Sequence, residues 1–415
     1  DMIVEVLAIG TELLLGQIVN SNATRIGERL ADAGLEHYQQ TVVGDNDERI
    51  VAALGAACSR AHAVIITGGL GPTQDDLTRE AMARAAGVEL IFDEEQAERL
   101  RERWTLRGRA MPESNLQQAE RPEGSTLIQN PKGTAPGIRM KVGEAWVFAL
   151  PGVPAEMIPM LENDVIPFLR GDDRSVVASR LLRTWGESES AIGELLSDLY
   201  DASSNPTIAF LASGGEIKVR ITAKATTQVE AMELIAPVEA TIRDRLGTLV
   251  FGADGDTIEV VVLRILEERG WTLGTAESAT GGLVAGRITS VPGSSSTFRG
   301  SIVAYATDIK EAELGVPAEV ISTHGVVSEP VAVAMAEGAR SVLGVDVALG
   351  LTGSAGPDPQ EQPVGTIVIA VATPGGTRVR TFRMPGDRER VRTFATTASL
   401  QLIRLSLQGV EWGTG

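Results

Sequence analysis

The chain has 415 residues, and this length predicts two or three domains. Hydrophobic residues make up 43% of the chain and charged residues 22%, which is ordinary for a globular protein and excludes the disordered class. The net charge of −18 argues against a nucleic-acid partner, and the longest apolar runs are too short to span a membrane. A single cysteine excludes a disulfide framework, and because the first residues carry no secretory signal we expect a cytoplasmic protein.

The first part of the chain alternates strands with helices. Apolar runs predict strands at 2–10, 63–67 and 145–152, and helical periodicity predicts helices at 22–33 and 78–86. This alternation is typical of a mostly parallel sheet with helices on both faces. In such sheets ligands bind beyond the carboxyl ends of the strands, so we expect the glycine- and proline-rich loops that follow these strands to converge.

A glycine loop followed by two carboxylates is the strongest local signal in this part. Residues 67–78 read TGGLGPTQDDLT. The glycines let backbone amides approach a phosphate, and carboxylates beside such an anion make sense when a divalent cation bridges them. Alternatively, Asp75 and Asp76 cap the helix that follows. We favour the metal–phosphate interpretation because the loop and the carboxylates occur together.

The middle part, 171–252, has a different pattern. A predicted hairpin at 208–226 is flanked by predicted helices at 187–200 and 229–246, which indicates a small α+β module. The module holds 8 Lys and Arg against 12 Asp and Glu, and its glycine pair Gly214-Gly215 is a hairpin turn instead of a nucleotide-clamping GxxG loop. We interpret it as a spacer or a dimer-forming element that packs against a neighbour.

The last part of the chain again alternates helices and strands. The predicted helices lie at 257–268, 281–291 and 388–407, and the predicted strands at 271–278, 298–307, 346–353 and 365–373. The predicted fold class is therefore α/β, with two α/β domains of mostly parallel sheets joined by the small α+β module. The predicted domain boundaries are 1–170, 171–252 and 253–415.

A candidate nucleophile lies where a predicted strand of the last domain turns into a helix. Ser278, in AESATGG, is placed near backbone N–H groups that are able to stabilise an oxyanion. A serine at a helix start is most often an N-cap, and spacing alone favours that interpretation.

Lys310, one of only five lysines in the chain, is the candidate base for this serine. A desolvated lysine with a lowered pKa replaces histidine in some nucleophilic enzymes. Tyr305 precedes the lysine, and it either relays a proton or orients the amine, or is only a surface aromatic. The alternative for Lys310 is that it is a solvated lysine at the start of a helix. His324 is a second candidate base, because a catalytic triad is defined by geometry and not by sequence order.

Further groups suited to an anion follow other predicted strands. Thr352-Gly353 and Ser294 stand in loops rich in glycine and serine, whose amides and hydroxyls are able to approach a phosphate. The last helix opens with the three arginines Arg388, Arg390 and Arg392, and one of them is able to bind two oxygens of a phosphate. Most surface arginines, however, only increase the solubility of the protein. Together with the serine and the lysine, these groups favour hydrolysis of a bond in a small phosphorylated molecule.

Five motifs that follow one another over about 257–408 resemble the motifs of a known protein family. AESATGG, the Tyr305–Lys310 segment, HGVVSE, LTGSAGP and GDRERVR resemble the C-terminal domain of the CinA family, which is similar to the PncC-type nicotinamide mononucleotide deamidases. The resemblance implies hydrolysis of the carboxamide of nicotinamide mononucleotide to nicotinic acid mononucleotide and ammonia, without a cofactor. It implies Ser278 as nucleophile, Lys310 as base and Tyr305 beside them. It implies substrate-binding roles for Thr352, Gly353 and Arg392, and the further candidate substrate-binding residues are Thr280, Gly281, Gly282 and Ser294.

Two positions depart from this family pattern. Ala279 stands where the family usually has cysteine, so a rival nucleophile is absent and the assignment narrows to Ser278. Ser354 stands where isoleucine is common, which affects pocket packing and leaves the main roles untouched.

Four motifs over about 2–168 carry a second resemblance. IGTELLLG, GGLGPTQDDLT, NPKGTAPG and ALPGVPAEM resemble the MoaB/MogA-like molybdopterin-binding domain in its CinA version, which is associated with metal-dependent ADP-ribose pyrophosphatase activity. This implies a divalent metal, Mg²⁺ or Co²⁺, held by Asp75 and/or Asp76, and cleavage of ADP-ribose to AMP and ribose 5-phosphate. Asp75 stands where related proteins often have arginine, which fits a changed metal or substrate role. The implied catalytic residue is Asp76, and the implied ligand-binding residues are Asp45, Gly68, Gly69, Gly71 and Thr73.

Three functions remain open at this point. The first is a bifunctional nucleotide hydrolase of NAD recycling, which the acidic balance and the set Ser278, Tyr305 and Lys310 favour. The second is a non-enzymatic competence or DNA-damage protein that acts through a partner, and the third is molybdopterin binding by the first domain. The family also carries a KH-like module in the middle. We expect small nucleotides as partners, no nucleic acid, no membrane, and a homodimer.

Overall fold

The computed structural model describes residues 2–106, 108–171, 175–202, 204–359 and 361–412. It divides into two compact units. The first runs to Ala178 and includes Lys224–Ala231, and the second comprises Ser179–Ala223 and the chain from Met232 onward. Within the described residues, every helix is too short or too polar to cross a membrane.

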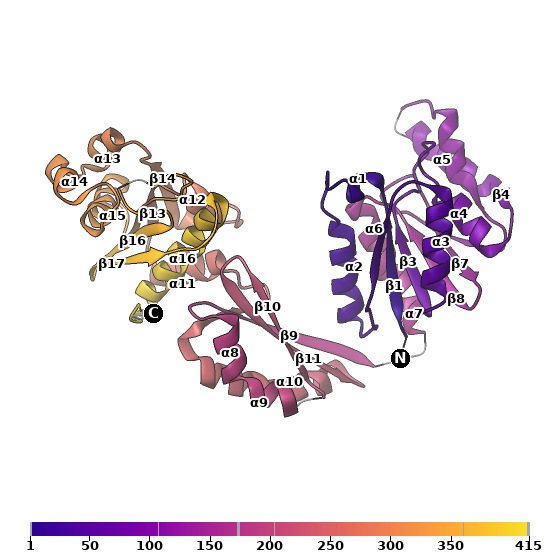
Figure 1. The fold of residues 1–415 in the computed structure, drawn as a ribbon, viewed down its shortest axis with the longest axis horizontal. Helices are drawn as coiled ribbons and strands as arrows, with labels where there is room; N and C mark the ends of the chain where they lie inside the picture. Colours follow the sequence, from indigo (N-terminus) through magenta and orange to yellow (C-terminus); the bar gives the residue numbers. More distant parts are fainter. Residues whose placement is uncertain (1, 107, 172–174, 203, 360, 413–415) are drawn as a thin grey trace. The chain divides into compact units, whose positions relative to one another are not determined.

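A six-stranded sheet forms the centre of the first unit (Figure 1). Its strand order is β2-β1-β3-β8-β7-β6, in which β2, β1, β3 and β8 are parallel and β7 and β6 add antiparallel pairs at one edge. The strands are β1 (Val4–Ile9), β2 (Gln40–Val43), β3 (Ala63–Thr67), β6 (Thr126–Ile128), β7 (Gly137–Val142) and β8 (Ala145–Leu150).

Helices cover both faces of this sheet, because β1 and β3 are apolar on both sides. Val4 and Val6 pack with Ile26 of α2 in one cluster, whereas Leu7 packs with Ile50 of α3 in the other. The helices are α1 (Thr11–Leu14), α2 (Ser21–Asp32), α3 (Asp47–Cys58), α4 (Thr78–Ala86), α5 (Glu94–Leu106), α6 (Pro154–Met160) and α7 (Ile166–Arg170), with a π-turn at Leu161–Val165 and a 3₁₀ segment at Glu113–Ala119. A small two-stranded sheet pairs β4 (Leu90–Phe92) with β5 (Glu120–Pro122).

A four-stranded sheet of order β10-β11-β9-β12 follows. The predicted hairpin is present, since β10 and β11 are antiparallel and turn at Gly214-Gly215. The predicted helix at 187–200 is divided into α8 and α9. The elements are β9 (Val176–Thr184), α8 (Glu189–Leu195), α9 (Ser197–Ala202), β10 (Thr207–Ser213), β11 (Glu216–Ala225), α10 (Gln228–Leu246), a 3₁₀ turn at Gly247–Leu249 and β12 (Val250–Ala253).

A five-stranded sheet of order β14-β13-β15-β16-β17 completes the second unit. Strands β14, β13 and β15 are parallel, and β16 and β17 continue the sheet with antiparallel pairs. The strands are β13 (Leu273–Glu277), β14 (Phe298–Val303), β15 (Val347–Gly353), β16 (Thr366–Thr373) and β17 (Gly376–Arg383). The helices are α11 (Ile258–Arg269), α12 (Leu283–Thr289), α13 (Thr307–Leu314), α14 (Ala318–His324), α15 (Glu329–Leu343) and α16 (Arg388–Gln408), with a 3₁₀ turn at Ser294–Ser296.

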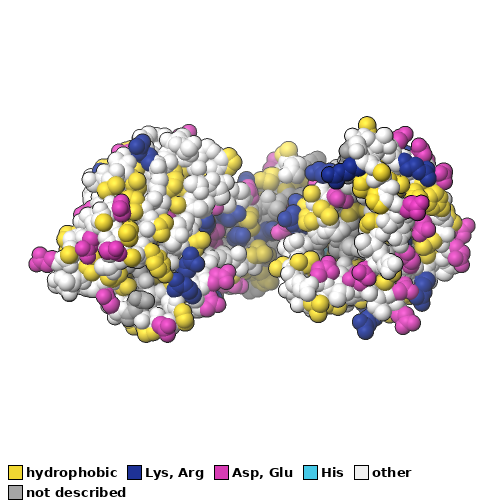
Figure 2. All heavy atoms as spheres, turned by 90° about the horizontal axis from the view of Figure 1, so that it is seen from above, with side chains coloured by type: hydrophobic (Ala, Val, Ile, Leu, Met, Phe, Trp, Pro, Cys, Tyr) yellow, Lys and Arg dark blue, Asp and Glu magenta, His cyan; other side chains and the backbone are white. Residues whose placement is uncertain are grey.

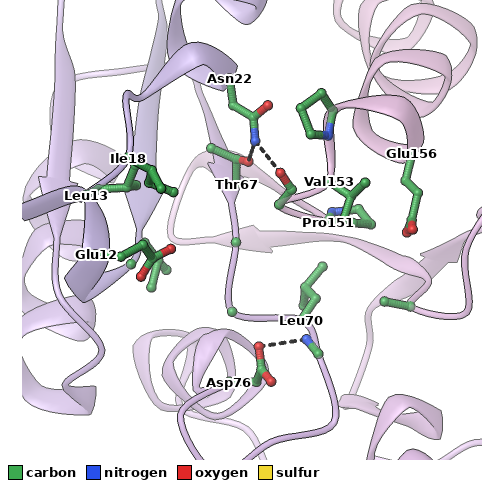
Figure 3. Close-up of a pocket in the computed structure, with 18 of the residues that line it drawn as sticks. Glu12, Leu13, Ile18, Asn22, Thr67, Leu70, Asp76, Pro151, Val153 and Glu156 are labelled. Atoms are coloured by element: carbon green, nitrogen blue, oxygen red, sulfur yellow. Dashed lines mark hydrogen bonds between the residues drawn. The ribbon is translucent and has the colours of Figure 1, made fainter. Parts of the chain in front are cut away.

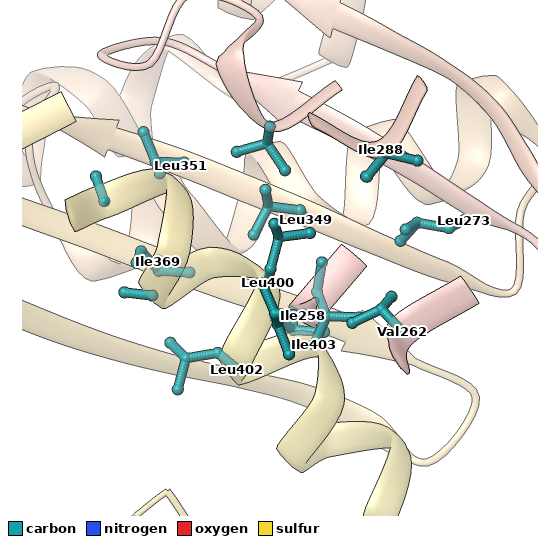
Figure 4. Close-up of a cluster of buried hydrophobic side chains, with 14 of the residues drawn as sticks. Ile258, Val262, Leu273, Ile288, Leu349, Leu351, Ile369, Leu400, Leu402 and Ile403 are labelled. Carbon is teal, nitrogen blue, oxygen red and sulfur yellow. The ribbon is translucent and has the colours of Figure 1, made fainter. Parts of the chain in front are cut away.

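The core of this sheet lies on both of its faces. On one face, Leu349 of β15 packs with Ile258 of α11 and Leu400 of α16 (Figure 4). On the other, Ala276 and Ala348 pack with Met335 of α15. The two layers explain why β15 is buried along nearly its whole length, and they fix the carboxyl ends of β13 and β15.

The predicted α/β fold class is confirmed. The helix predicted at 78–86 coincides with α4, and the closing helix predicted at 388–407 is α16 with one more residue. Each large sheet also contains antiparallel pairs. Tight turns join β7 to β8 in the first sheet and β16 to β17 in the second, so these neighbouring strands run in opposite directions. Acidic side chains lie all over the face drawn in Figure 2, mixed with smaller groups of Lys and Arg.

Candidate functional site

A cavity of about 360 Å³ lies in the second unit, where β13 and β15 end and α13 and α16 begin. This is the position at which open α/β sheets bind their ligands, because the loops that leave adjacent parallel strands meet there. The cavity is lined by Ser278, Ala279, Tyr305, Ala306, Thr307, Val326, Val327, Thr352, Gly353, Ala355, Gly356, Asp358, Glu361 and Arg388.

Ser278 and Lys310 meet at this cavity. The Lys310 Nζ atom lies 3.1 Å from the Ser278 Oγ atom, although the two residues are 32 positions apart in the chain. The same Nζ atom also donates to the backbone oxygens of Ala304, at 2.8 Å, and Tyr305, at 3.0 Å. The amine is thus held by three acceptors, one of which is the candidate nucleophile.

The Lys310 amine is removed from water. The residue is 0% exposed, in spite of lying in the first turns of α13. Burial lowers the pKa of the Lys310 amine from its ordinary value to about 8, because desolvation disfavours the charged form. A lysine with such a pKa is partly neutral near neutral pH and is able to accept a proton.

Two alternative interpretations of the sequence are wrong. Ser278 is not an N-cap, because α12 begins at Leu283 and its N-cap is Gly282. Lys310 is not a solvated helix-start lysine, because it is fully buried. His324 is exposed at the end of α14 and does not line the cavity, so the geometry does not offer it as the base.

Tyr305 and Arg388 line the mouth of the cavity together. The Tyr305 side chain is 60% exposed, and its hydroxyl accepts a hydrogen bond of 3.0 Å from the Arg388 guanidinium. Arg388 also donates to the backbone oxygen of Gly356, which follows β15. The Tyr305 hydroxyl therefore faces an arginine, and only the backbone oxygen of Tyr305 contacts the Lys310 amine.

The other predicted binding residues divide into two groups. Thr352 and Gly353 line the cavity, and the Thr352 hydroxyl donates to the backbone oxygen of Val326. Arg392 does not line it: its guanidinium donates to the backbone oxygens of Ala279 and Thr280 and so holds the loop that carries Ser278. Those predicted residues that also lie outside the lining are Thr280, Gly281, Gly282 and Ser294.

Two acidic lining residues have no counterpart in the sequence prediction. They are Asp358 and Glu361, which follow β15 in a loop. Their isolated positions in the sequence carry no motif signal. Only the tertiary structure brings them to the cavity that holds Ser278.

A second cavity, of about 690 Å³, lies in the first unit beyond the ends of β1, β3 and β8. Figure 3 shows Glu12, Asp76 and Glu156 around it. The Asn22 side chain ties two of the strand ends together, because its amide donates to the Thr67 hydroxyl at 3.1 Å and to the Gly152 backbone oxygen at 2.6 Å. The predicted residues Asp45, Gly68, Gly69, Gly71, Asp75 and Asp76 line this cavity, and Thr73 does not.

The glycine loop of this cavity is closed by Asp76. One carboxylate oxygen of Asp76 accepts from the Gly71 amide at 2.8 Å, and the other accepts from the amide and the hydroxyl of Thr73. The alternative that the aspartates cap α4 is wrong, because the N-cap is Leu77 and no side chain caps it. Gly68 has a positive φ of 102°, and a Cβ there would lie 2.4 Å from the backbone oxygen of Ile9, so only glycine fits.

The charged groups that line this cavity are all acidic. They are Glu12, Asp45, Asp75, Asp76 and Glu156, and the lining contains no Lys, Arg or His among the described residues. Asp45 and Glu156 already accept hydrogen bonds, from the Thr11 amide and from the Asn130 side chain. An anion in this cavity therefore needs an added cation to balance these carboxylates.

The donor set fits a hard divalent cation that keeps part of its water. Within the described residues, no three His, Cys, Asp or Glu side chains are grouped closely enough to hold a metal alone. Mg²⁺ is usually bound through one or two carboxylates, with substrate oxygens and waters as its other ligands. Oxygen ligands of this kind are present, and Asp75 is exposed at the cavity.

Family models match each of the three parts of the chain. A family model described as CinA C-terminal domain matches residues 255–407, which hold the Ser278–Lys310 pair. A model described as probable molybdopterin binding domain matches residues 5–171, and one described as damage-inducible protein CinA KH domain matches residues 179–252.

Relatives extend over nearly the whole chain. A CinA-like protein of Frankia casuarinae is 50% identical over 98% of this chain and 96% of its own length. A CinA-like protein of Dictyoglomus thermophilum is 44% identical over 97% of this chain and 98% of its own. A crystal structure of the protein CinA from Thermoplasma acidophilum is 36% identical, covers 39% of this chain and 95% of its own, and has a TM-score of 0.37. The chain therefore belongs to the CinA family.

Proposed function

We propose that the second unit is a nicotinamide mononucleotide deamidase, in which Ser278 attacks the carboxamide and Lys310 moves the protons. The observation that carries this proposal is the 3.1 Å contact between Lys310 Nζ and Ser278 Oγ at a cavity, with the amine fully buried. A nucleophile in contact with a base of lowered pKa is the arrangement that acyl transfer requires.

The contacts of the amine direct its lone pair. A neutral lysine has two N–H bonds and one lone pair. The backbone oxygens of Ala304 and Tyr305 accept the two N–H bonds, so the lone pair faces the Ser278 hydroxyl. Ser278 Oγ then forms a bond to the carboxamide carbon while its proton passes to Lys310 Nζ.

The acylation step ends with loss of ammonia. The C–N bond of the tetrahedral intermediate breaks, and Lys310 returns the proton to the leaving nitrogen. Ala279 lines the cavity beside Ser278, and among the described residues its backbone N–H has no acceptor. It is the donor that this mechanism assigns to the developing oxyanion.

Water completes the cycle. Lys310 accepts a proton from a water molecule that attacks the ester carbon on Ser278, and the C–O bond to the serine breaks as the proton returns to Oγ. The products are nicotinic acid mononucleotide and ammonia. Every step moves a proton to or from the Lys310 amine, which contacts Ser278 Oγ beside the cavity.

Ammonia release from nicotinamide mononucleotide tests this function directly. We expect release by the wild-type chain and loss of release in Ser278→Ala, because an alanine has no nucleophilic oxygen. Equal release by both proteins would exclude Ser278. No release by either would favour the alternative of a non-enzymatic protein that acts through a partner in competence or DNA damage.

For the first unit, we propose metal-dependent hydrolysis of ADP-ribose to AMP and ribose 5-phosphate. The specific observation in favour is the large cavity lined by a glycine loop and by five acidic side chains, with no basic side chain from the described residues. The amides of the loop bind and orient phosphate oxygens, and Asp76 holds that loop in shape through Gly71 and Thr73.

A divalent cation, Mg²⁺ or Co²⁺, would be held here by Asp75, with Asp76 beside it, and when bound would neutralise the pyrophosphate charge. The test is a titration of ADP-ribose and of molybdopterin with and without each metal. Metal-dependent binding and cleavage of ADP-ribose support the proposal. Tighter, metal-independent binding of the pterin would replace it with molybdopterin binding.

A further inference from the structure

A buried carboxylate stands directly before the nucleophile. Glu277 is the last residue of β13 and is 0% exposed. A buried carboxylate is costly unless its oxygens are fully hydrogen bonded or paired with a cation. Among the described residues, no Lys, Arg or His side chain contacts Glu277, so hydrogen bonds alone hold it.

The side chain of Glu277 accepts hydrogen bonds from three elements. One oxygen accepts from the Thr280 hydroxyl at 2.7 Å and from the amides of Gly282 and Val284 at 3.1 Å each. The other oxygen accepts at 2.9 Å from the Ala285 amide, and it has further donors in β13 and β14, which are the hydroxyls of Thr275 and Ser301. Every partner is a donor, and a carboxylate is the side chain that accepts at both oxygens.

Most of these donors follow the nucleophile in the chain. Thr280 and Gly282 belong to the turn that leaves Ser278, and Ala285 lies in the first turns of α12. The turn contains Gly281 and Gly282, which have positive φ values of 60° and 97°. The Glu277 carboxylate holds this turn at the end of β13, together with the Arg392 guanidinium, which binds the backbone oxygens of Ala279 and Thr280.

The backbone of the same residue holds the base. The Glu277 backbone oxygen accepts a 2.9 Å hydrogen bond from the amide of Ala304. Ala304 in turn supplies one of the acceptors of the Lys310 amine, at 2.8 Å. Glu277 thus contacts the neighbours of both reactive groups. Its side chain binds the turn that follows Ser278, and its backbone oxygen binds Ala304, which accepts a hydrogen bond from Lys310.

We propose that Glu277 is a positioning residue for the deamidase reaction, whose buried carboxylate sets the place of Ser278 Oγ relative to Lys310 Nζ. This inference rests on the proposed function and adds a residue to it. Glu277 does not line the cavity, so it acts through the Ser278 loop and not on the substrate.

Glu277→Gln is the sharpest change, because it keeps the shape and replaces one acceptor oxygen by a donor. Whichever oxygen becomes the amide nitrogen, at least one backbone N–H of α12 or its entry turn then faces another donor. The expected result is a fall in kcat of about 100-fold with KM changed less than about threefold, because a displacement of about 1 Å costs that much in rate.

The matched control is Asp346→Asn, at the opposite end of β13. Asp346 accepts from the amide and the hydroxyl of Thr272, at 2.8 and 2.9 Å, just before β13 begins. If Glu277 only stabilised the sheet, both variants would lower the thermal midpoint and leave kcat per folded molecule unchanged. The proposal requires a kcat loss in Glu277→Gln alone.

A second readout separates this inference from the proposed function. A fluorophosphonate labels an activated serine: the Ser278 O–P bond forms, the P–F bond breaks, fluoride leaves and the serine proton passes to Lys310. Intact mass gives the labelling rate without any substrate. Wild-type labelling without ammonia release would reject the proposed substrate, and slower labelling of Glu277→Gln would still support positioning.

Two outcomes would overturn the inference. One is a folded Glu277→Gln that labels and turns over as the wild type does. The other is a wild type whose Ser278 is not labelled at all, because then there is no activated serine to position. Should Glu277→Gln fail to fold, Thr280→Val removes only the 2.7 Å hydrogen bond to the carboxylate, and its labelling rate is expected to fall about tenfold; an unchanged rate would reject the proposal.

Discussion

The cavity of about 360 Å³ in the second unit and the cavity of about 690 Å³ in the first lie at the same position in two α/β sheets, beyond the ends of parallel strands. In the smaller one, a serine and a buried lysine already touch. In the larger one, five carboxylates surround a glycine loop, and no basic side chain among the described residues balances them. The same fold class thus presents one cavity where a serine and a lysine are brought together by protein packing, and one whose proposed reaction requires a cation from solution.

The first way to break this comparison is Ser278→Ala. Ammonia release should fall by about 10⁴-fold or more, whereas ADP-ribose cleavage should be unchanged, because the nucleophile serves only the second unit. Both rates are measured on the same protein preparation. Ser322→Ala is the control, since Ser322 lies on α14 and its hydroxyl donates only within that helix. Retention of ammonia release in Ser278→Ala would contradict the assignment.

The second is removal of divalent metal with a chelator. ADP-ribose cleavage should fall by about 100-fold or more and return when Mg²⁺ or Co²⁺ is added back, because the carboxylates of that cavity then repel the pyrophosphate. Ammonia release should stay the same, since its proposed steps use only Ser278, Lys310 and a backbone amide. Loss of ammonia release on chelation would contradict the metal-independent mechanism proposed for the second unit.

The third prediction tests the role of Arg388 in the smaller cavity. Arg388→Met removes a cation from the cavity and the hydrogen bond to the Tyr305 hydroxyl, and kcat/KM for ammonia release should fall about 30-fold, as expected for a charged hydrogen bond. Arg390→Met is the matched control, because the Arg390 guanidinium lies over the Phe394 ring and is absent from the lining. Equal losses in both variants would show that the effect arises from the helix and not from the cavity.

The fourth is the pH dependence of ammonia release. The pKa of the buried Lys310 amine is lowered to about 8, and only its neutral form accepts the serine proton. Falling pH protonates the amine, so kcat/KM should drop about tenfold per unit below this value and level off above it. A rate that is flat from about pH 6 to about pH 8 would exclude Lys310 as the base.

The smallest expected effect concerns stability in the larger cavity. Asp76→Asn should lower the free energy of unfolding of the first unit by about 1–3 kcal/mol, because a donor then faces the amide of Gly71 or Thr73. Asp75→Asn should change it by less than about 0.5 kcal/mol, since Asp75 is exposed. Calorimetric unfolding measures both, and ADP-ribose cleavage by Asp75→Asn reports on metal binding separately. Equal destabilisation by the two variants would contradict the loop-closing role of Asp76.

Much of the fold could be predicted from local pattern. The strand β3 is a short run of apolar residues that ends in glycines, and α4 and α16 begin where sequence signals place them. No helix is predicted over α15, whose buried face is largely alanine and therefore gives a weak hydrophobic signal. The antiparallel edge strand β17 is half-exposed and rich in arginine, which hides its strand character.

The sequence by itself determined which residue types were available: one lysine after Lys224, a serine between a strand and a glycine pair, and a glycine loop before two aspartates. Only the tertiary structure decided which of them meet. Ser278 and Lys310 are brought together because β13 and β14 are parallel and adjacent, and the lysine is fully buried. The physical reason is that strand and helix patterns are local, whereas burial and a lowered pKa arise from contacts between segments far apart in the chain.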